Sequence, residues 1–123
     1  MSAWFLIAGL NGALAVAAGA FAAHGLQGRI DAHALSIFET GARYHMYHAL
    51  AIGLAALAMK GAAAQTAQYA AMFFLGGILL FSGSLYILAL SGVRAVAIVT
   101  PFGGVAFLIG WVLLAYAGTR LAP

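Results

Sequence analysis

The chain has 123 residues, of which 66% are apolar and only 6% are charged, whereas about a quarter of the residues of soluble domains are charged. A soluble fold of this length could not bury so much apolar surface, so the composition predicts an all-α membrane protein, with residues 1–123 forming one four-helix transmembrane domain. The net charge of +3 comes from five scattered basic residues rather than from a nucleic-acid-binding patch, and the lack of cysteine excludes disulfides and thiolate sites.

The first predicted element is a transmembrane helix at about 3–23, an apolar run that only Asn11 interrupts. This run has about the 20 residues that are needed to cross the hydrocarbon core of a bilayer. Small residues at 20–22 resemble a signal-peptide cleavage site, but the start of the chain lacks the basic residues of a signal peptide, so we expect a retained span. Gly25 and Gly28 then predict the end of the helix.

From Asp31 the pattern predicts a short amphipathic helix at the membrane interface, which leads into a second span at about 42–59. The strictly apolar part of this span, 49–59, is too short to cross a bilayer alone. The polar residues 44–48 must therefore enter the headgroup region or lie deeper in the membrane.

Two further spans are predicted at about 69–90 and 101–117. Thr100 precedes Pro101, and this pair suits an N-cap followed by proline in the first helical position, where no backbone N–H is needed. The alternative is a longer helix that begins at Ala95 and is kinked at Pro101.

The basic residues are divided between the two ends of the predicted bundle. Four spans place the N-terminus, Lys60 and Arg120 on one side of the membrane, and Arg29, Arg43 and Arg94 on the other. If the N-terminal amine is counted and Arg43 is neutralised by a partner, the distribution favours cytoplasmic termini.

Small residues recur at helix-packing spacing in three of the predicted spans. In lipid, such residues let two helix backbones approach closely, although alanine-rich spans also contain such pairs by chance. We expect the protein to form homo-oligomers through these positions, with the first span as the main contact. The predicted packing glycines are Gly12, Gly19, Gly76, Gly83 and Gly110.

The stretch ETGARYHMYHAL concentrates ionisable side chains in a chain that has few others. At about 100° per residue, Glu39, Arg43 and Tyr47 fall on one stripe of a helix, whereas His45 and His48 fall on the opposite side. Glu39 and Arg43 are four residues apart, and this spacing predicts an ion pair that acts as a structural clasp. A proton-relay role for Glu39 is the alternative.

We interpret the two histidines of this stretch as side chains that are hydrogen-bonded to backbone, tyrosine or lipid headgroups. The alternative is a metal or haem site to which His24 and His33 would add ligands. Because Glu39 points away from the histidines and one helix offers only two clustered ligands, we predict no metal and no cofactor. His24, at the end of the first span, is explained more simply as a favourable charge at a helix C-terminus.

The stretch LFSGSLY places Ser82 and Tyr86 on one helical face, with Gly83 allowing close approach of a neighbour. Interhelical hydrogen bonds are the expected role, and a solute-binding patch completed by Thr100 is the alternative. The predicted polar centre, structural or lipid- or solute-binding, consists of Glu39, Arg43, Tyr44, His45, Tyr47, His48, His24, Ser82 and Tyr86.

Four motifs occur in order: GAFAAHGL at 19–26, ETGARYHMYHAL at 39–50, LFSGSLY at 80–86 and TPFGG at 100–104. Together they resemble, over nearly the whole chain, the family called domain of unknown function 423, which also includes animal transmembrane protein 256. Ala22 stands where the family typically has glycine. The resemblance implies a four-span, multi-pass protein of the inner (plasma) membrane, and it brings no established activity, substrate or catalytic residue.

The sequence contains no recognisable catalytic or nucleotide-binding motif. We therefore expect a non-enzymatic scaffold or accessory factor that is surrounded by membrane lipids and has no nucleic-acid partner. One alternative is a small-solute, ion or lipid-handling protein whose polar centre lines a pathway or a headgroup site. Another is a redox protein linked to haem, metal or quinone.

Overall fold

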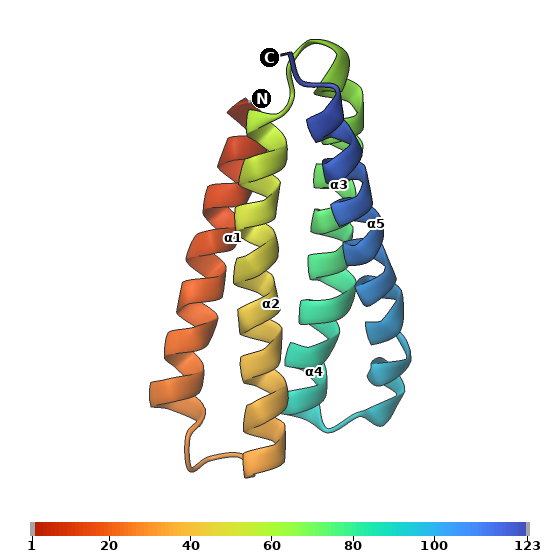
Figure 1. Ribbon diagram of the computed structural model, residues 1–123. Coiled ribbons are helices and arrows are strands. Elements are labelled where there is room, and N and C mark those ends of the chain that lie inside the picture. The colour runs from red at the N-terminus through yellow and green to blue at the C-terminus, as the bar shows by residue number, and fades with distance from the viewer. Residues whose placement is uncertain (1, 123) are drawn as a thin grey trace.

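The computed structural model describes residues 2–122, with only the backbone described at Ser2. Figure 1 shows long helices side by side, with both termini and the α2–α3 connection at one end of the bundle. The helices are α1 (Ser2–Phe21), α2 (Ala32–Leu57), α3 (Ala64–Gly77), α4 (Gly83–Ser91) and α5 (Thr100–Thr119). Short π-helical or 3₁₀ segments extend them: η1 (Ala22–Leu26), η2 (Gly61–Ala63), η3 (Ile78–Ser82) and η4 (Arg94–Ile98).

Three helical segments of the described chain are long and apolar enough to cross a membrane. They are Ala3–Leu26, Gly61–Ser91 and Arg94–Thr119. Each contains one of the predicted spans, so the first, third and fourth spans are confirmed as helices able to cross. Helix α2 also has 26 residues, but polar side chains lower its hydropathy and it is not among the three.

The segment predicted as a short amphipathic helix that leads into the second span is the beginning of α2. Asp31 caps this helix, because its carboxylate accepts a hydrogen bond of 2.8 Å from the Ala34 N–H, and α2 then continues unbroken to Leu57. Phe38 is buried and packs in a cluster with Ala89. The apolar side of this segment therefore contacts neighbouring helices, and its place at the membrane interface stays a prediction.

Two of the helix ends depend on glycines with positive φ. Gly28 (φ +83°) lies in the α1–α2 connection and Gly92 (φ +71°) ends α4, and other residues are strained in this backbone region. Gly25 lies inside η1 and does not end the helix. Thr100 lies within α5, so the N-cap predicted there is wrong, and η4 makes the segment helical before Pro101, as the alternative predicts.

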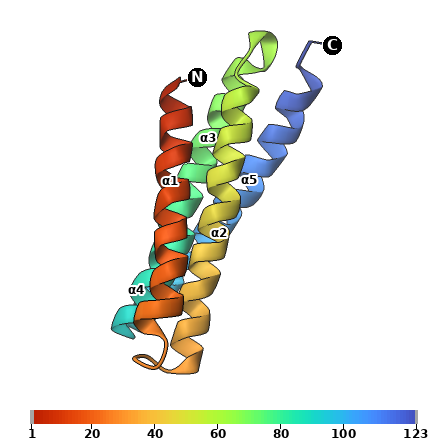
Figure 2. The same ribbon diagram turned by 90° about the vertical axis from the view of Figure 1, so that its left-hand side faces the viewer.

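Helices α3 and α5 approach closely at glycines. A Cβ atom added at Gly110 would lie 2.7 Å from Cδ1 of Phe74, and one added at Gly103 would collide with backbone atoms of Leu80 and Phe81. The π-helical segment η3 lies at this crossing, and Figure 2 shows α5 inclined across the other helices. Close backbone contact of this kind is the main source of dispersion energy between helices in lipid.

The predicted packing glycines behave differently from one another. Gly110 packs against Phe74 as expected, but a Cβ added at Gly12, Gly19 or Gly76 would meet no atom within 4 Å. At Gly83 the nearest such atom is only the carbonyl oxygen of the preceding turn, at 3.9 Å. The four glycines other than Gly110 therefore form no close helix crossing within one chain. A role for them between chains stays a prediction.

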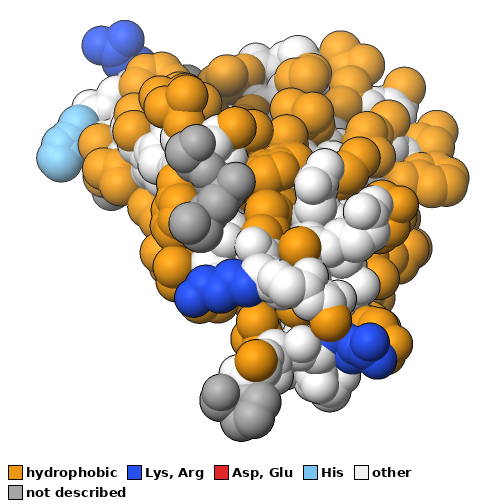
Figure 3. All heavy atoms as spheres, turned by 90° about the horizontal axis from the view of Figure 1, so that it is seen from above, with side chains coloured by type: hydrophobic (Ala, Val, Ile, Leu, Met, Phe, Trp, Pro, Cys, Tyr) orange, Lys and Arg blue, Asp and Glu red, His pale blue; other side chains and the backbone are white. Residues whose placement is uncertain are grey.

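The outer surface of the bundle is apolar. Large aliphatic side chains such as Val112, Leu108 and Leu14 are 70%, 67% and 60% exposed, whereas Phe74 and Ile52 in the centre are fully buried. Figure 3, a view onto the end with both termini, shows mainly hydrophobic side chains and isolated basic groups. An apolar exterior around a packed core is typical of a protein whose solvent is lipid.

Candidate functional site

His45 is the point at which three helices are joined by side-chain hydrogen bonds. Its Nε2 atom lies 3.0 Å from Oδ1 of Asn11 on α1, and its Nδ1 atom lies 2.9 Å from the hydroxyl of Tyr86 on α4. The imidazole is buried, with 5% of the residue exposed. Sequence-distant polar groups therefore meet in the interior of the bundle.

The chemistry of its partners determines which nitrogen of His45 carries hydrogen. The Asn11 amide nitrogen donates to the Ile7 carbonyl at 2.9 Å, so the Asn11 oxygen faces the imidazole. A carboxamide oxygen can only accept, so Nε2 must donate to it. In the neutral ring, Nδ1 then accepts the hydrogen of the Tyr86 hydroxyl.

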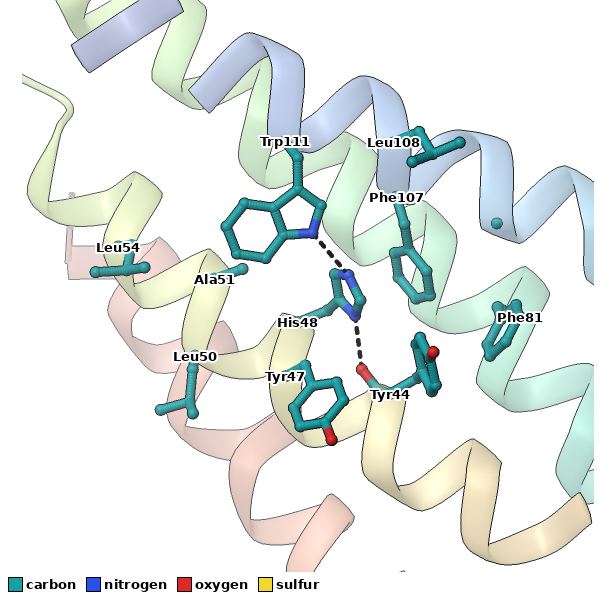
Figure 4. A pocket seen from close by; sticks show the side chains of 11 residues that line it. Tyr44, Tyr47, His48, Leu50, Ala51, Leu54, Phe81, Phe107, Leu108 and Trp111 are labelled. Carbon is teal, nitrogen blue, oxygen red and sulfur yellow. Dashed lines mark hydrogen bonds between the residues drawn. The ribbon is translucent and has the colours of Figure 1, made fainter. Parts of the chain in front are cut away.

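His48 is also hydrogen-bonded through both ring nitrogens, but its hydrogen lies on the other nitrogen (Figure 4). The indole Nε1–H of Trp111 on α5 donates to His48 Nε2 at 3.0 Å, and Nδ1 lies 2.7 Å from the Tyr44 carbonyl. Because an indole N–H can only donate and a carbonyl can only accept, the ring is neutral and carries its hydrogen on Nδ1. The imidazole also stacks on Phe107, with the ring centroids 3.5 Å apart.

Two serines add further links between helices. Ser82 donates to the Gly41 carbonyl on α2 at 2.8 Å, and the hydroxyls of Ser84 and Thr100 are hydrogen-bonded to each other. The interhelical hydrogen bonds predicted for Ser82 and Tyr86 are therefore confirmed. Among the described residues, every buried side-chain nitrogen and oxygen atom has a hydrogen-bond partner.

The predicted division of α2 into two faces is confirmed, but the clasp is not. His45 and His48 are buried, whereas Glu39, Arg43 and Tyr47 are exposed. The Arg43 Nη2 atom lies 3.5 Å from the Thr40 hydroxyl, and no ion pair joins the Glu39 and Arg43 side chains, both of which the structure describes. The i to i+4 spacing puts both charges on one face but does not make exposed side chains meet.

His24 also lies outside the centre. It is exposed in the last turn of η1, as its predicted place at a helix C-terminus requires, and His33 is exposed at the start of α2. The four histidines therefore do not converge. Within the described residues, no group of three or more His, Cys, Asp or Glu side chains is arranged to hold a metal ion.

Sequence reasoning missed the partners Asn11 and Trp111. Asn11 is the one polar side chain that interrupts an apolar run, and a buried carboxamide in a span needs a hydrogen-bond partner, so this signal was available. No pattern in the sequence pairs Trp111 with His48, which lies 63 residues away along the chain. The depth at which α5 lies against α2 decides that contact.

A lateral groove of about 590 Å³ lies beside His48, between α2 and α5 (Figure 4). Its lining is mostly apolar, and both nitrogens of the histidine that borders it are already hydrogen-bonded. The side chains of Tyr44 and Tyr47, on the exposed side of α2, form part of its edge. We call this feature the lateral groove; its lining residues are Tyr44, Tyr47, His48, Leu50, Ala51, Leu54, Phe81, Gly104, Phe107, Leu108 and Trp111.

An all-helical bundle with three membrane-capable segments, an apolar exterior and an internally hydrogen-bonded polar centre defines a helical membrane protein. Comparison of the sequence with known protein families identifies the family as well as this class. The family described as "Protein of unknown function (DUF423)" matches residues 18–104. The chain belongs to this family, as the four sequence motifs predict.

Named relatives extend the match to nearly the full chain. The chain is 41% identical to UPF0382 membrane protein SAB0533 of Staphylococcus aureus, over 99% of both chains. It is 41% identical to UPF0382 membrane protein YwdK of Bacillus subtilis, over 98% of both, and 44% identical to a UPF0382 membrane protein of Haemophilus influenzae, over 95% of this chain and 94% of that one. No solved structure matches the chain. The protein is thus a membrane protein of a family whose activity is unknown.

Proposed function

We propose that the protein is a non-enzymatic scaffold of the inner (plasma) membrane, in which four helices cross the bilayer and the polar residues hold them together. One observation carries the proposal: both ring nitrogens of His45 and of His48 are occupied by partners inside the protein. A general base, a proton carrier or a metal ligand needs a free nitrogen that faces its substrate or its metal. The polar centre therefore serves to hold the helices together by side-chain hydrogen bonds.

The proposal includes α2 as a fourth span, and two observations support this. Helix α2 lies against α1, with His45 contacting Asn11 well inside the Ala3–Leu26 segment. Its 26 residues also extend about 39 Å at about 1.5 Å per residue, which exceeds the ~30 Å of hydrocarbon. The inward face of α2 is satisfied by neighbouring helices, so low hydropathy does not prevent insertion.

The four-span arrangement can be tested because the chain has no cysteine of its own. Single variants Gln27→Cys and Val93→Cys should be labelled from outside intact cells by a membrane-impermeant maleimide, whereas Ala62→Cys should be labelled only after permeabilisation. All three positions are exposed in connections between helices. Labelling of Ala62→Cys and Gln27→Cys from the same side would show that α2 does not cross.

A lipid-handling function is the second candidate, and the lateral groove is the observation that favours it. Its volume suits an acyl or isoprenoid chain, with tyrosine side chains at its edge. Native mass spectrometry of the purified protein distinguishes the two candidates. A scaffold should carry no stoichiometric small molecule, whereas a ligand that persists and is lost in Gly104→Leu, which fills the groove, would favour lipid handling.

A further inference from the structure

One face of α2 is exposed along the length of the helix and carries both charges of the motif. We call it the α2 stripe; it consists of Ser36, Glu39, Arg43, Tyr47, Leu50, Leu54 and Leu57, all exposed and spaced three or four residues apart. Ser36, Arg43, Leu50 and Leu57 recur every seven residues, which is the periodicity of a helix that packs lengthwise against another helix. Within the described part of the chain, every side chain of this stripe stays exposed.

The depth of the two charges makes this exposure costly, given that α2 crosses the membrane as proposed above. Arg43 lies about 17 Å from the first residue of α2 and about 21 Å from the last, at about 1.5 Å per residue. His45, two residues further, contacts Asn11 in the middle part of α1. Exposed charges at this depth would face hydrocarbon, and charged residues in spans face protein or water instead.

We infer that two copies of the chain pair through the α2 stripe, with Glu39 of each copy bonded to Arg43 of the other. Within the described residues the Arg43 side chain has one hydrogen bond, to the Thr40 hydroxyl on its own helix, and Glu39 has no ion-pair partner. A face that carries one acid and one base is self-complementary. A two-fold axis therefore forms two reciprocal ion pairs from a single surface.

The position of the arginine side chain suits this arrangement. Side chains on a helix lean toward its N-terminus, and the contact with Thr40 places the Arg43 guanidinium close to the level of Glu39. Two copies inserted with the same orientation have their Glu39 side chains at equal depth. Each guanidinium then meets the carboxylate of the other copy without a shift of either helix.

The flanks of the stripe allow a second helix to approach. A shallow apolar groove between α1 and α2 borders it and includes Gly12, Gly53 and the stripe residue Leu50. No atom lies within 4 Å of a Cβ added at Gly12, and only one Ala8 atom, at 3.9 Å, at Gly53. Small residues beside an apolar ridge are typical of contacting membrane helices. The self-association predicted for the first span would thus be centred on α2, with Gly12 at its margin.

The test is disulfide cross-linking in native membranes with the naturally cysteine-free chain. Leu50→Cys should form a covalent dimer on mild oxidation. Val112→Cys is the matched control, because Val112 is 70% exposed on α5 and follows Trp111, whose indole reaches His48 at the same depth. A dimer in the control but not in Leu50→Cys would overturn the proposal.

Charge exchange then tests the ion pairs. In the Leu50→Cys background, Glu39→Arg or Arg43→Glu should each lower the dimer yield by about tenfold or more, because like charges would meet. Mixed dimers of one Glu39→Arg copy and one Arg43→Glu copy should recover the yield, as should the double variant Glu39→Arg with Arg43→Glu. Recovery in mixed dimers cannot come from pairing within one chain.

Unchanged yields in the single variants, or no recovery in either pairing, would overturn the inference and show that another partner or water covers the stripe. The maleimide labelling of Gln27→Cys and Ala62→Cys is carried out on the same charge variants, with these cysteines in place of Leu50→Cys. It reports separately whether α2 crosses the membrane. A failure of the dimer is thereby distinguished from a failure of the four-span proposal.

Discussion

Gly103→Ala should lower the free energy of unfolding of the bundle by about 3 kcal/mol, at the upper end of the cost of overpacking a core. The added Cβ would lie 2.7 Å from Cβ of Phe81 and 2.8 Å from the carbonyl carbon of Leu80. These atoms belong to the neighbouring chain segment itself, so no side-chain rotation can make room. Segment η3 and helix α5 would have to separate, and thermal unfolding in a mild detergent measures the loss.

Gly104→Ala is the matched control for this prediction. The neighbouring glycine lies in the same helix, but the nearest atom to its added Cβ is Cδ2 of Phe81 at 4.0 Å, an ordinary contact. The two substitutions change helix propensity equally, by about 1 kcal/mol in favour of alanine. Gly104→Ala should therefore be neutral or slightly stabilising. Equal melting temperatures for the two variants would mean that η3 and α5 do not pack closely at Gly103.

His45→Leu should cost about 2–4 kcal/mol of stability, because it leaves two partly buried polar groups without their partner. The Asn11 carboxamide oxygen loses a donor, and the Tyr86 hydroxyl loses an acceptor. Because the imidazole joins α1, α2 and α4, its loss should loosen all three helices together. Unfolding of the variant in the same detergent measures the effect.

A double-mutant cycle separates the hydrogen bond from simple loss of packing. Asn11→Leu removes the group that His45→Leu leaves without a donor, so the double variant should lose less than the sum of the two single losses. We expect a coupling of about 1 kcal/mol, within the range measured for hydrogen bonds between membrane helices. Strictly additive losses would mean that His45 and Asn11 do not bond.

Periodicity predicted the faces of α2 correctly. Counting 100° per residue puts His45 and His48 opposite Glu39, and the structure buries the first two and exposes the third. The same reasoning placed Ser82 and Tyr86 together on a face that bonds to α2. These predictions succeed because they depend only on the geometry of one helix.

Predictions that require two helices to be placed relative to each other succeeded less often. A Cβ added at Gly103 would collide with the backbone of η3, whereas one added at Gly12 would meet no atom within 4 Å, although both glycines have small neighbours in the sequence. Trp111 meets His48 because of the depth at which α5 packs against α2. The Glu39–Arg43 clasp fails because proximity along a helix does not determine where long exposed side chains point. Relative depth and tilt of helices are tertiary properties that a single sequence does not display.

The central claim is that the histidines are internal locks whose nitrogens are all occupied, and ¹⁵N magnetic resonance of the imidazoles in lipid bilayers tests it most directly. The hydrogen bonds require opposite tautomers: hydrogen on Nε2 of His45 and on Nδ1 of His48. The exposed His24 and His33 provide internal references. We expect one signal of each tautomer from the buried pair, both unchanged by added Zn²⁺. A doubly protonated His48, the same tautomer at both positions, or a metal-induced shift of either ring would contradict the account.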